Sequence, residues 1–210
     1  MNVEIEFPHQ NDVLQTLTDI NALIKGHFVY TSGRHGNEYI LKDKLRAYPI
    51  KTKKLCQYLA EQFRDDRIEV VVGPATGGII LSQYVAAYLG DQVFSVFTEK
   101  GKSGHHEFNR GYSEFVKGKR VLVTEDNLTT GSSVRDAVNA VKAAGGKVIG
   151  VSAICNRGGV KKEDIGNPEK FVCLANIPLE SWEGNGCPLC ADGTPINTNA
   201  GKGADFLAQN

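Results

Sequence analysis

The chain alternates short apolar runs with longer stretches in which apolar residues recur at helical spacing. The apolar runs predict strands over 69–72, 92–97, 120–124 and 147–154, with a weaker fifth over 171–174. Helices are expected over 79–89 and over 134–144, where one apolar face is formed by Val134, Ala137, Val138, Val141 and Ala144. Strands that alternate with helices predict an α/β fold, a doubly wound and mainly parallel sheet, whose ligands bind at the carboxyl ends of strands.

The N-terminal part of the chain follows a different pattern. Asn11 can cap a helix, Gly26 would end it, and its apolar face is Val13, Leu17, Ile20 and Ile24. Two short apolar segments, 27–31 and 39–41, then flank the turn-rich run Ser32-Gly33-Arg34-His35-Gly36-Asn37. This arrangement predicts a hairpin.

The rest of the chain completes a single domain. A further helix is expected after Pro49, with Leu55, Leu59 and Phe63 on its apolar face. Residues 98–120 form a long polar stretch between two predicted strands. Residues 183–210 are rich in Gly, Asn, Thr and Pro, so we expect them to form an irregular tail. Without a repeat or a separate linker, residues 1–210 are expected to form one domain, with the N-terminal helix and hairpin within 1–48.

Composition and charge narrow the classes of function. The 210 residues include 24 Lys+Arg and 24 Asp+Glu, which gives a formal net charge of +0, and 41% are hydrophobic. This composition is typical of an ordinary globular domain rather than of a disordered or coiled-coil chain. Proteins that bind duplex DNA usually carry a basic excess, so no nucleic-acid partner is expected.

Neither export nor membrane insertion is expected. The first ten residues, MNVEIEFPHQ, contain two acids and lack the basic and apolar segments of a secretory signal. Residues 70–90 carry no charge, but Gly73-Pro74 and Gly77-Gly78 interrupt them, which favours a strand, a loop and a buried helix over a membrane span. The odd set of five cysteines suits a reducing compartment, so a cytoplasmic location is expected.

The most informative segment is 121–133, VLVTEDNLTTGSS. An apolar strand brings two adjacent acids, Glu125 and Asp126, to its end, and a turn then opens a helix. Backbone N–H groups, hydroxyls and the helix N-terminus suit a phosphate dianion at the five turn residues, Thr129, Thr130, Gly131, Ser132 and Ser133. Since the acids would repel a phosphate, we expect them to accept hydrogen bonds from sugar hydroxyls or to favour positive charge on a ribose.

Phosphate and ribose together indicate a phosphoribosyl ligand, although a solvated turn followed by a simple helix cap would use the same residue types. The segment resembles the motif with which type I phosphoribosyltransferases bind phosphoribosyl pyrophosphate (PRPP): an apolar strand, two acids, two further residues, then Thr-Thr-Gly-x-Ser. The two further residues here are Asn127 and Leu128, and Asn127 is more polar than the usual aliphatic residue.

Two other loops fit this resemblance. The run Val72-Gly73-Pro74-Ala75-Thr76-Gly77-Gly78 is either a tight turn or a loop that approaches a ligand closely. In the resembling family the matching loop contacts pyrophosphate, and a lysine often stands at the position of Gly77. Residues 98–120 are either a solvated loop or a lid over the site. A lid would suit a pyrophosphate leaving group, because the basic residues of this segment outnumber its three glutamates: Lys100, Lys102, Arg110, Lys117, Lys119 and Arg120.

Three features resemble orotate phosphoribosyltransferases in particular. The segment 26–35, GHFVYTSGRH, looks like the hood that covers the base in that family. Glu99-Lys100, with Arg110-Gly111 later in the lid, resembles one bacterial and archaeal branch of the family. Arg157 stands where the family's orotate-binding arginine falls, just past a predicted strand, and a guanidinium can pair with the orotate carboxylate through two hydrogen bonds.

The resemblance implies transfer of the phosphoribosyl group from PRPP to orotate, which yields orotidine 5′-monophosphate and pyrophosphate. It assigns the phosphate cradle to residues 129–133, the ribose contacts to Glu125 and Asp126, pyrophosphate to Lys100, and orotate to Arg157 with Thr129 nearby. Mg²⁺ would be carried by PRPP oxygens rather than by a dedicated protein site. In the family the lid acts across a dimer interface, so a homodimer is implied.

The pair Cys187 and Cys190 falls in a segment that also looks like the tail of this branch. A lone Cys-x-x-Cys supplies only two ligands, whereas a structural zinc site needs four. The sequence therefore favours a packed or turn-forming pair, and no metal ligands are predicted.

Other functions stay open at this point. Gly77, the sparse lid and Asn127 are compatible with a phosphoribosyltransferase for another base. A protein that senses PRPP without catalysis would keep the motif but needs a partner surface, and the neutral charge indicates none. A mononucleotide-binding protein is a third possibility, but it would have little use for two carboxylates beside the sugar.

Overall fold

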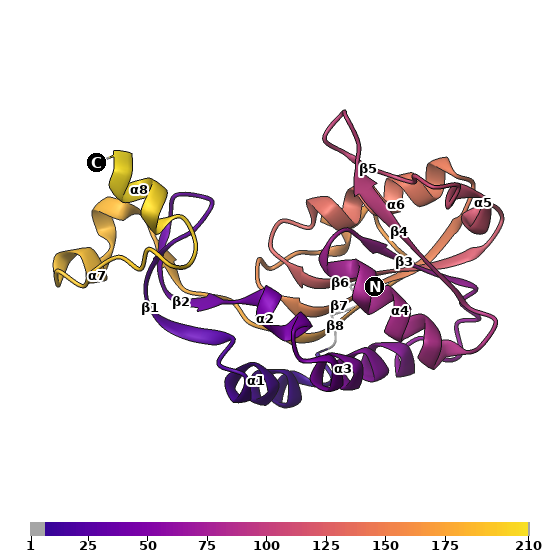
Figure 1. The fold of residues 1–210 in the computed structure, drawn as a ribbon, viewed down its shortest axis with the longest axis horizontal. Coiled ribbons are helices and arrows are strands. Elements are labelled where there is room, and N and C mark those ends of the chain that lie inside the picture. Colours follow the sequence, from indigo (N-terminus) through magenta and orange to yellow (C-terminus); the bar gives the residue numbers. More distant parts are fainter. Residues whose placement is uncertain (1–6, 210) are drawn as a thin grey trace.

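The computed structural model describes residues 7–209 and has a six-stranded sheet between two layers of helices, from which a smaller three-stranded sheet projects (Figure 1). The first six residues, where no secretory signal was expected, lie outside the described part of the chain. Among the helices of residues 7–209, none combines the length and apolar character that a membrane span requires. The charge-free residues 70–90 instead form a buried strand and a helix of the domain.

The large sheet is mainly parallel, as predicted. Its strands are β3 (Val70–Pro74), β4 (Phe94–Lys100), β5 (His106–Glu107), β6 (Arg120–Leu128), β7 (Lys147–Asn156) and β8 (Lys170–Asn176), in the order β5-β4-β3-β6-β7-β8. Only β5 runs antiparallel to its neighbour. The strand order reverses between β3 and β6, so the loops that follow these two strands flank the crevice where doubly wound sheets bind ligands.

The two faces of the sheet carry separate apolar clusters. In β3, Val71 belongs to the cluster under α1 (Gln10–Asp19), α3 (Pro49–Glu61) and α4 (Gly77–Leu89), whereas Val70 and Val72 belong to the cluster under α6 (Ser132–Ala143). This alternation follows from the two-residue period of a strand. The second cluster also takes in α5 (Ser113–Val116) and the 3₁₀ helix η1 (Lys162–Ile165).

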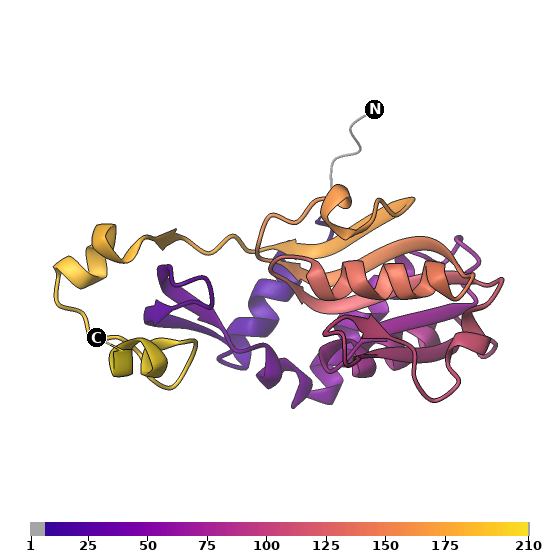
Figure 2. The ribbon, with the colours of Figure 1, turned by 90° about the horizontal axis from the view of Figure 1, so that it is seen from above.

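The smaller sheet contains the predicted hairpin, β1 (Leu23–Val29) and β2 (His35–Ile40), which we call the hood, and the short strand β9 (Ser181–Trp182). Helix α2 (Lys42–Arg46) connects the hood to the main body. Figure 2 shows the chain after β8 running away from the main sheet and then alongside the hood.

The predicted N-terminal helix begins and ends earlier than expected. It starts after His9 rather than Asn11, and it stops at Ile20, because Asn21 adopts the left-handed conformation with φ 50°. The N–H groups of Asn21 and Ala22 then donate to the carbonyls of Thr18 and Leu17, the hydrogen bonds of a Schellman motif. Ile24 and Gly26 consequently lie in β1, not in the helix.

Two predicted irregular segments contain regular structure. Strand β4 continues to Lys100 and pairs with β5, and α5 follows, so residues 98–120 are a hairpin and a short helix rather than a featureless loop. The tail contains η2 (Gly184–Gly186), α7 (Pro188–Ala191) and α8 (Gly203–Gln209). It is held in place because the N–H groups of Asn197 and Lys202 donate to the carbonyls of His27 and Val29 in β1, each over 2.7 Å.

Candidate active site

The predicted acid pair lies inside strand β6 rather than after its end. The strand continues to Leu128 because it keeps pairing with β7, where Glu125 is opposite Ala153. Glu125 and Asp126 are only 8% and 5% exposed, and the N–H of Asp126 donates to Oε1 of Glu125 over 2.9 Å. Burial, and then the neighbouring Asp126 carboxylate, raise the pKa of Glu125 to about 8, so this side chain is mostly neutral at pH 7.

Arg46 provides a cationic partner for the acid pair. Its Nη1 donates to Oδ2 of Asp126 over 3.1 Å, and its other terminal nitrogen pairs with Asp43. Gly77 at the start of α4 leaves room for this contact, because a Cβ there would lie 2.4 Å from Oδ2 of Asp126 and 2.9 Å from Nη1 of Arg46. In this chain a side chain at position 77, where the resembling family often has lysine, would overlap with the Arg46–Asp126 pair.

The loop after β6 forms a small cavity at the start of α6. Gly131 caps the helix with φ 73°, and a Cβ there would lie 2.8 Å from Cγ2 of Ile165. Thr130 and Ser132 place their hydroxyl oxygens 3.1 Å apart at the helix N-terminus. The cavity measures about 140 Å³ and is lined by Lys42, Glu125, Asp126, Asn127, Leu128, Thr129, Thr130, Gly131, Ser132, Ser133 and Val134. Its N–H groups, hydroxyls and helix end are those expected of a phosphate site.

Leu128 contributes through its backbone rather than its side chain. The side chain is 1% exposed and belongs to the apolar core. Its carbonyl accepts hydrogen bonds from the N–H groups of Arg157 and Gly158, over 2.9 and 3.1 Å. A Cβ at position 158 would lie 1.6 Å from the carbonyl oxygen of Thr129. The loops after β6 and β7 are thus packed directly against each other.

A larger cavity of about 830 Å³ opens between the main sheet and the hood. The guanidinium carbon of Arg157 lies 5.2 Å from the ring centre of Tyr30 and 5.9 Å from that of Tyr39. Tyr30 sits over Gly36, where a Cβ would lie only 2.1 Å from its hydroxyl oxygen. Two aromatic rings and a guanidinium can recognise a flat, anionic ring.

The two cavities adjoin, because Lys42, Asn127, Thr129 and Thr130 line both. The side-chain oxygen of Asn127 is buried and has no hydrogen-bond partner among residues 7–209. A buried acceptor without a partner is costly unless a ligand supplies the donor. Asn127, a departure from the family pattern, is therefore suited to contact a ligand.

The structure does not bring Lys100 to this site. It is exposed at the end of β4, opposite His106 in the β4–β5 hairpin, and lines neither cavity. Nearby, Arg110 pairs with Glu99 through hydrogen bonds of 3.2 and 3.3 Å. All other candidate residues line the smaller cavity or, in the case of Arg157, the larger one.

Several residues of the site were not predicted. Lys42 and Arg46 belong to α2, a five-residue helix that has no clear periodic pattern in the sequence. Tyr39 lies in the predicted hairpin, but its proximity to Arg157 depends on how the hood packs over the sheet. No local signal identifies these three residues.

Comparison with known proteins agrees with this geometry. The phosphoribosyl transferase domain family matches residues 45–190. The orotate phosphoribosyltransferases of Caldicellulosiruptor bescii and Desulforamulus reducens are 39% and 37% identical over 87% and 89% of this chain, and the chain covers 93% and 94% of their lengths. The solved structure of Mycobacterium tuberculosis orotate phosphoribosyltransferase in complex with inorganic phosphate shares the fold, with a TM-score of 0.64 at 24% identity over 79% of this chain and 96% of that one. The chain belongs to the orotate phosphoribosyltransferase family.

Proposed function

We propose that this protein transfers the phosphoribosyl group of PRPP to orotate, a step of pyrimidine biosynthesis, with release of pyrophosphate. The observation that carries the proposal is the junction of two cavities, one built for phosphate and one that places Arg157 beside two tyrosine rings. A carboxylate on a flat base distinguishes orotate from uracil, adenine and hypoxanthine. Arg157 is the group that can recognise it.

The chain's own residues act by positioning and by charge. The 5′-phosphate lies in the loop 129–133, where the start of α6 favours negative charge. The ribose hydroxyls contact Glu125 and Asp126, and the Asp126 carboxylate also favours the positive charge that develops on the ribosyl carbon. Holding both substrates in adjoining cavities supplies the orientation that a reaction without a protein nucleophile requires.

We propose that Mg²⁺ binds together with PRPP. Carboxylate oxygens at the end of β6 are donors that suit a hard cation, and Mg²⁺ usually binds through substrate phosphates and only one or two protein carboxylates. Asp126 and the protonatable Glu125 would hold such an ion with the ribose and pyrophosphate oxygens. When bound, Mg²⁺ neutralises charge on the leaving pyrophosphate.

Lys100 fits the proposal if it acts on a second copy of the chain. It lies outside both cavities of its own chain, and it is exposed together with residues 102–105 of the turn that follows it. We infer a homodimer in which each lid supplies Lys100 to the pyrophosphate of the partner's site. A cytoplasmic location follows from the same proposal, because the free thiols and the pathway suit a reducing compartment.

The experiment is a pyrophosphate-release assay with PRPP, Mg²⁺ and a panel of orotate, uracil, adenine and hypoxanthine. We expect turnover with orotate, and Arg157→Lys should raise the KM for orotate about tenfold or more, because lysine keeps the charge but loses the paired hydrogen bonds. Arg64→Lys, at an exposed position, is the matched control. Turnover with a purine alone would contradict orotate as the substrate, and full orotate turnover by Arg157→Ala would contradict the role of that residue.

A further inference from the structure

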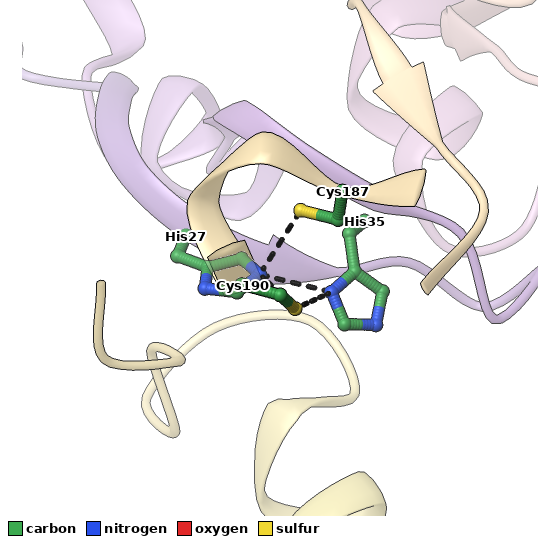
Figure 3. A group of neighbouring side chains, drawn as sticks. All are labelled: His27, His35, Cys187 and Cys190. Carbon is green, nitrogen blue, oxygen red and sulfur yellow. Dashed lines mark hydrogen bonds between the residues drawn. The ribbon is translucent and has the colours of Figure 1, made fainter. Parts of the chain in front are cut away.

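Two histidines and two cysteines that are far apart in the sequence meet between the hood and the tail (Figure 3). His27 comes from β1, His35 begins β2, Cys187 precedes α7 and Cys190 lies within it. Their ligand atoms all lie within 4.8 Å of one another, and His27, His35 and Cys187 are buried. None of the four lines either cavity of the active site.

Three distances between the ligand atoms fall in the range of a tetrahedral site. With bonds of about 2.3 Å to sulfur and about 2.0 Å to nitrogen, the edges of a tetrahedron around zinc measure about 3.3–3.8 Å. Nε2 of His27 lies 3.6 Å from Sγ of Cys187 and 3.7 Å from Sγ of Cys190, and Sγ of Cys190 lies 3.4 Å from Nδ1 of His35. The two histidine nitrogens are closer, at 2.9 Å.

A hydrogen bond outside the cluster sets the protonation of His27. Its Nδ1 lies 2.7 Å from the carbonyl oxygen of Thr194, which can only accept, so Nδ1 carries the proton. In the neutral ring Nε2 then has a free lone pair directed at the two sulfur atoms. Ligand histidines typically donate their second ring N–H to a carbonyl in this way.

Packing alone explains the cluster less well than a cation does. Without a metal, one proton can bridge the two imidazoles, but both thiols then face nitrogen atoms that are already engaged. Four electron-pair donors directed at one point repel each other unless a cation lies between them. Two sulfurs and two imidazoles favour Zn²⁺ over Mg²⁺ or Ca²⁺.

We propose that His27, His35, Cys187 and Cys190 bind one Zn²⁺ ion as a closed structural site that fastens the tail to the hood. The preference for a packed cysteine pair was based on two ligands, and the fold supplies the other two. Since all four positions are filled by protein, no coordination position is left for a substrate. The site does not depend on the reaction proposed above.

The hood needs such a link because it has little core of its own. Phe28 and Val29 are buried there with Cys187, but none of the three belongs to either large apolar cluster of the main body. Small units that bury little apolar surface are commonly stabilised by a metal. Tyr30 of the hood and Gly201 of the tail line the larger cavity, so the ion would also fix two of its walls.

The test begins with the metal content of the unmodified protein. After expression with zinc supplied, elemental analysis should find about one zinc per chain, and Cys190→Ala or His35→Ala should reduce this to below about 0.1. Asp126→Asn, in the active site, and Cys56→Ala, a core cysteine outside the cluster, should both retain the ion. Zinc loss in either control, or a stoichiometric metal other than zinc, would overturn the assignment.

Spectroscopy and stability provide a readout that does not require the variants to fold. Removal of the metal and addition of Co²⁺ to the unmodified protein should produce the visible absorption bands of a tetrahedral thiolate site. A chelator should lower the Tm, and added Zn²⁺ should restore it. Substoichiometric zinc in replete protein, or a Cys187–Cys190 disulfide found by mass spectrometry, would overturn the proposal.

Discussion

Nη1 of Arg46 donates to Oδ2 of Asp126 over 3.1 Å, and the backbone of Gly77 passes beside both groups without a side chain. The arginine comes from a short helix between the hood and α3, and the acid comes from the central strand. The contact therefore couples the connection to the hood with the acid that we propose contacts the ribose.

Gly77→Ala should disturb this contact, because its Cβ would overlap with both Asp126 and Arg46. We expect kcat/KM for PRPP to fall about tenfold or more, the effect of losing a hydrogen bond to a charged group. Steady-state kinetics with each substrate varied in turn will measure it. Gly186→Ala, where a Cβ would have no atom within 4 Å, is the matched control and should leave the kinetics unchanged.

The protonation of Glu125 should make stability depend on pH. The folded pKa is raised to about 8, above the value of about 4.3 in an unfolded chain, so the folded state binds more protons between these limits. The contribution of Glu125 to the free energy of unfolding should therefore decrease as the pH rises from 5 to 8, by up to about 1 kcal/mol per pH unit.

Glu125→Gln removes the titrating group and should flatten that part of the profile. Urea unfolding of both proteins at several pH values tests this, and the stability of the variant relative to the unmodified protein should increase with pH. Parallel profiles would mean that Glu125 is ionised in the folded protein across the whole range.

Gly131→Ala should destabilise the protein more than Gly33→Ala. Both glycines have positive φ, 73° and 79°, but only at Gly131 would a Cβ meet atoms of Ile165 and Val160, at 2.8 and 3.0 Å. The backbone conformation should cost about 1 kcal/mol at each position, and the overlap about 1–3 kcal/mol more at Gly131. Urea unfolding compares the two variants, and equal losses would show that the loop relaxes without cost.

Mixed dimers should reveal whether Lys100 acts on the partner's site. Lys100→Ala and Arg157→Ala chains should each have little activity alone, but a heterodimer would contain one intact site if the lid crosses the interface. Random mixing of equal amounts should then restore about a quarter of the unmodified activity, since half of the dimers are mixed. No recovery after verified subunit exchange would place Lys100 in the site of its own chain or outside the reaction.

The local parts of the site could be predicted because strand, acids, turn and helix follow one another within residues 121–133. The apolar run, the glycine with positive φ and the helix start are short-range features, and each has its own residue preference. The sequence places the end of β6 too early, because pairing with β7 continues through the polar residues 125–127 to Leu128. Strand pairing depends on a distant segment and leaves no mark in the local pattern.

The sequence by itself determined the order of the main parallel strands and their helices, the turn that opens α6 and the family resemblance, since all of these depend on neighbouring residues. Only the tertiary structure decided that Arg46 reaches Asp126, that Arg157 lies beside Tyr30, and that His27 and His35 meet a cysteine pair more than 150 residues away. These contacts come from packing between the hood, the tail and the sheet. Such packing reflects the shape and burial of whole surfaces, which no single stretch of sequence encodes.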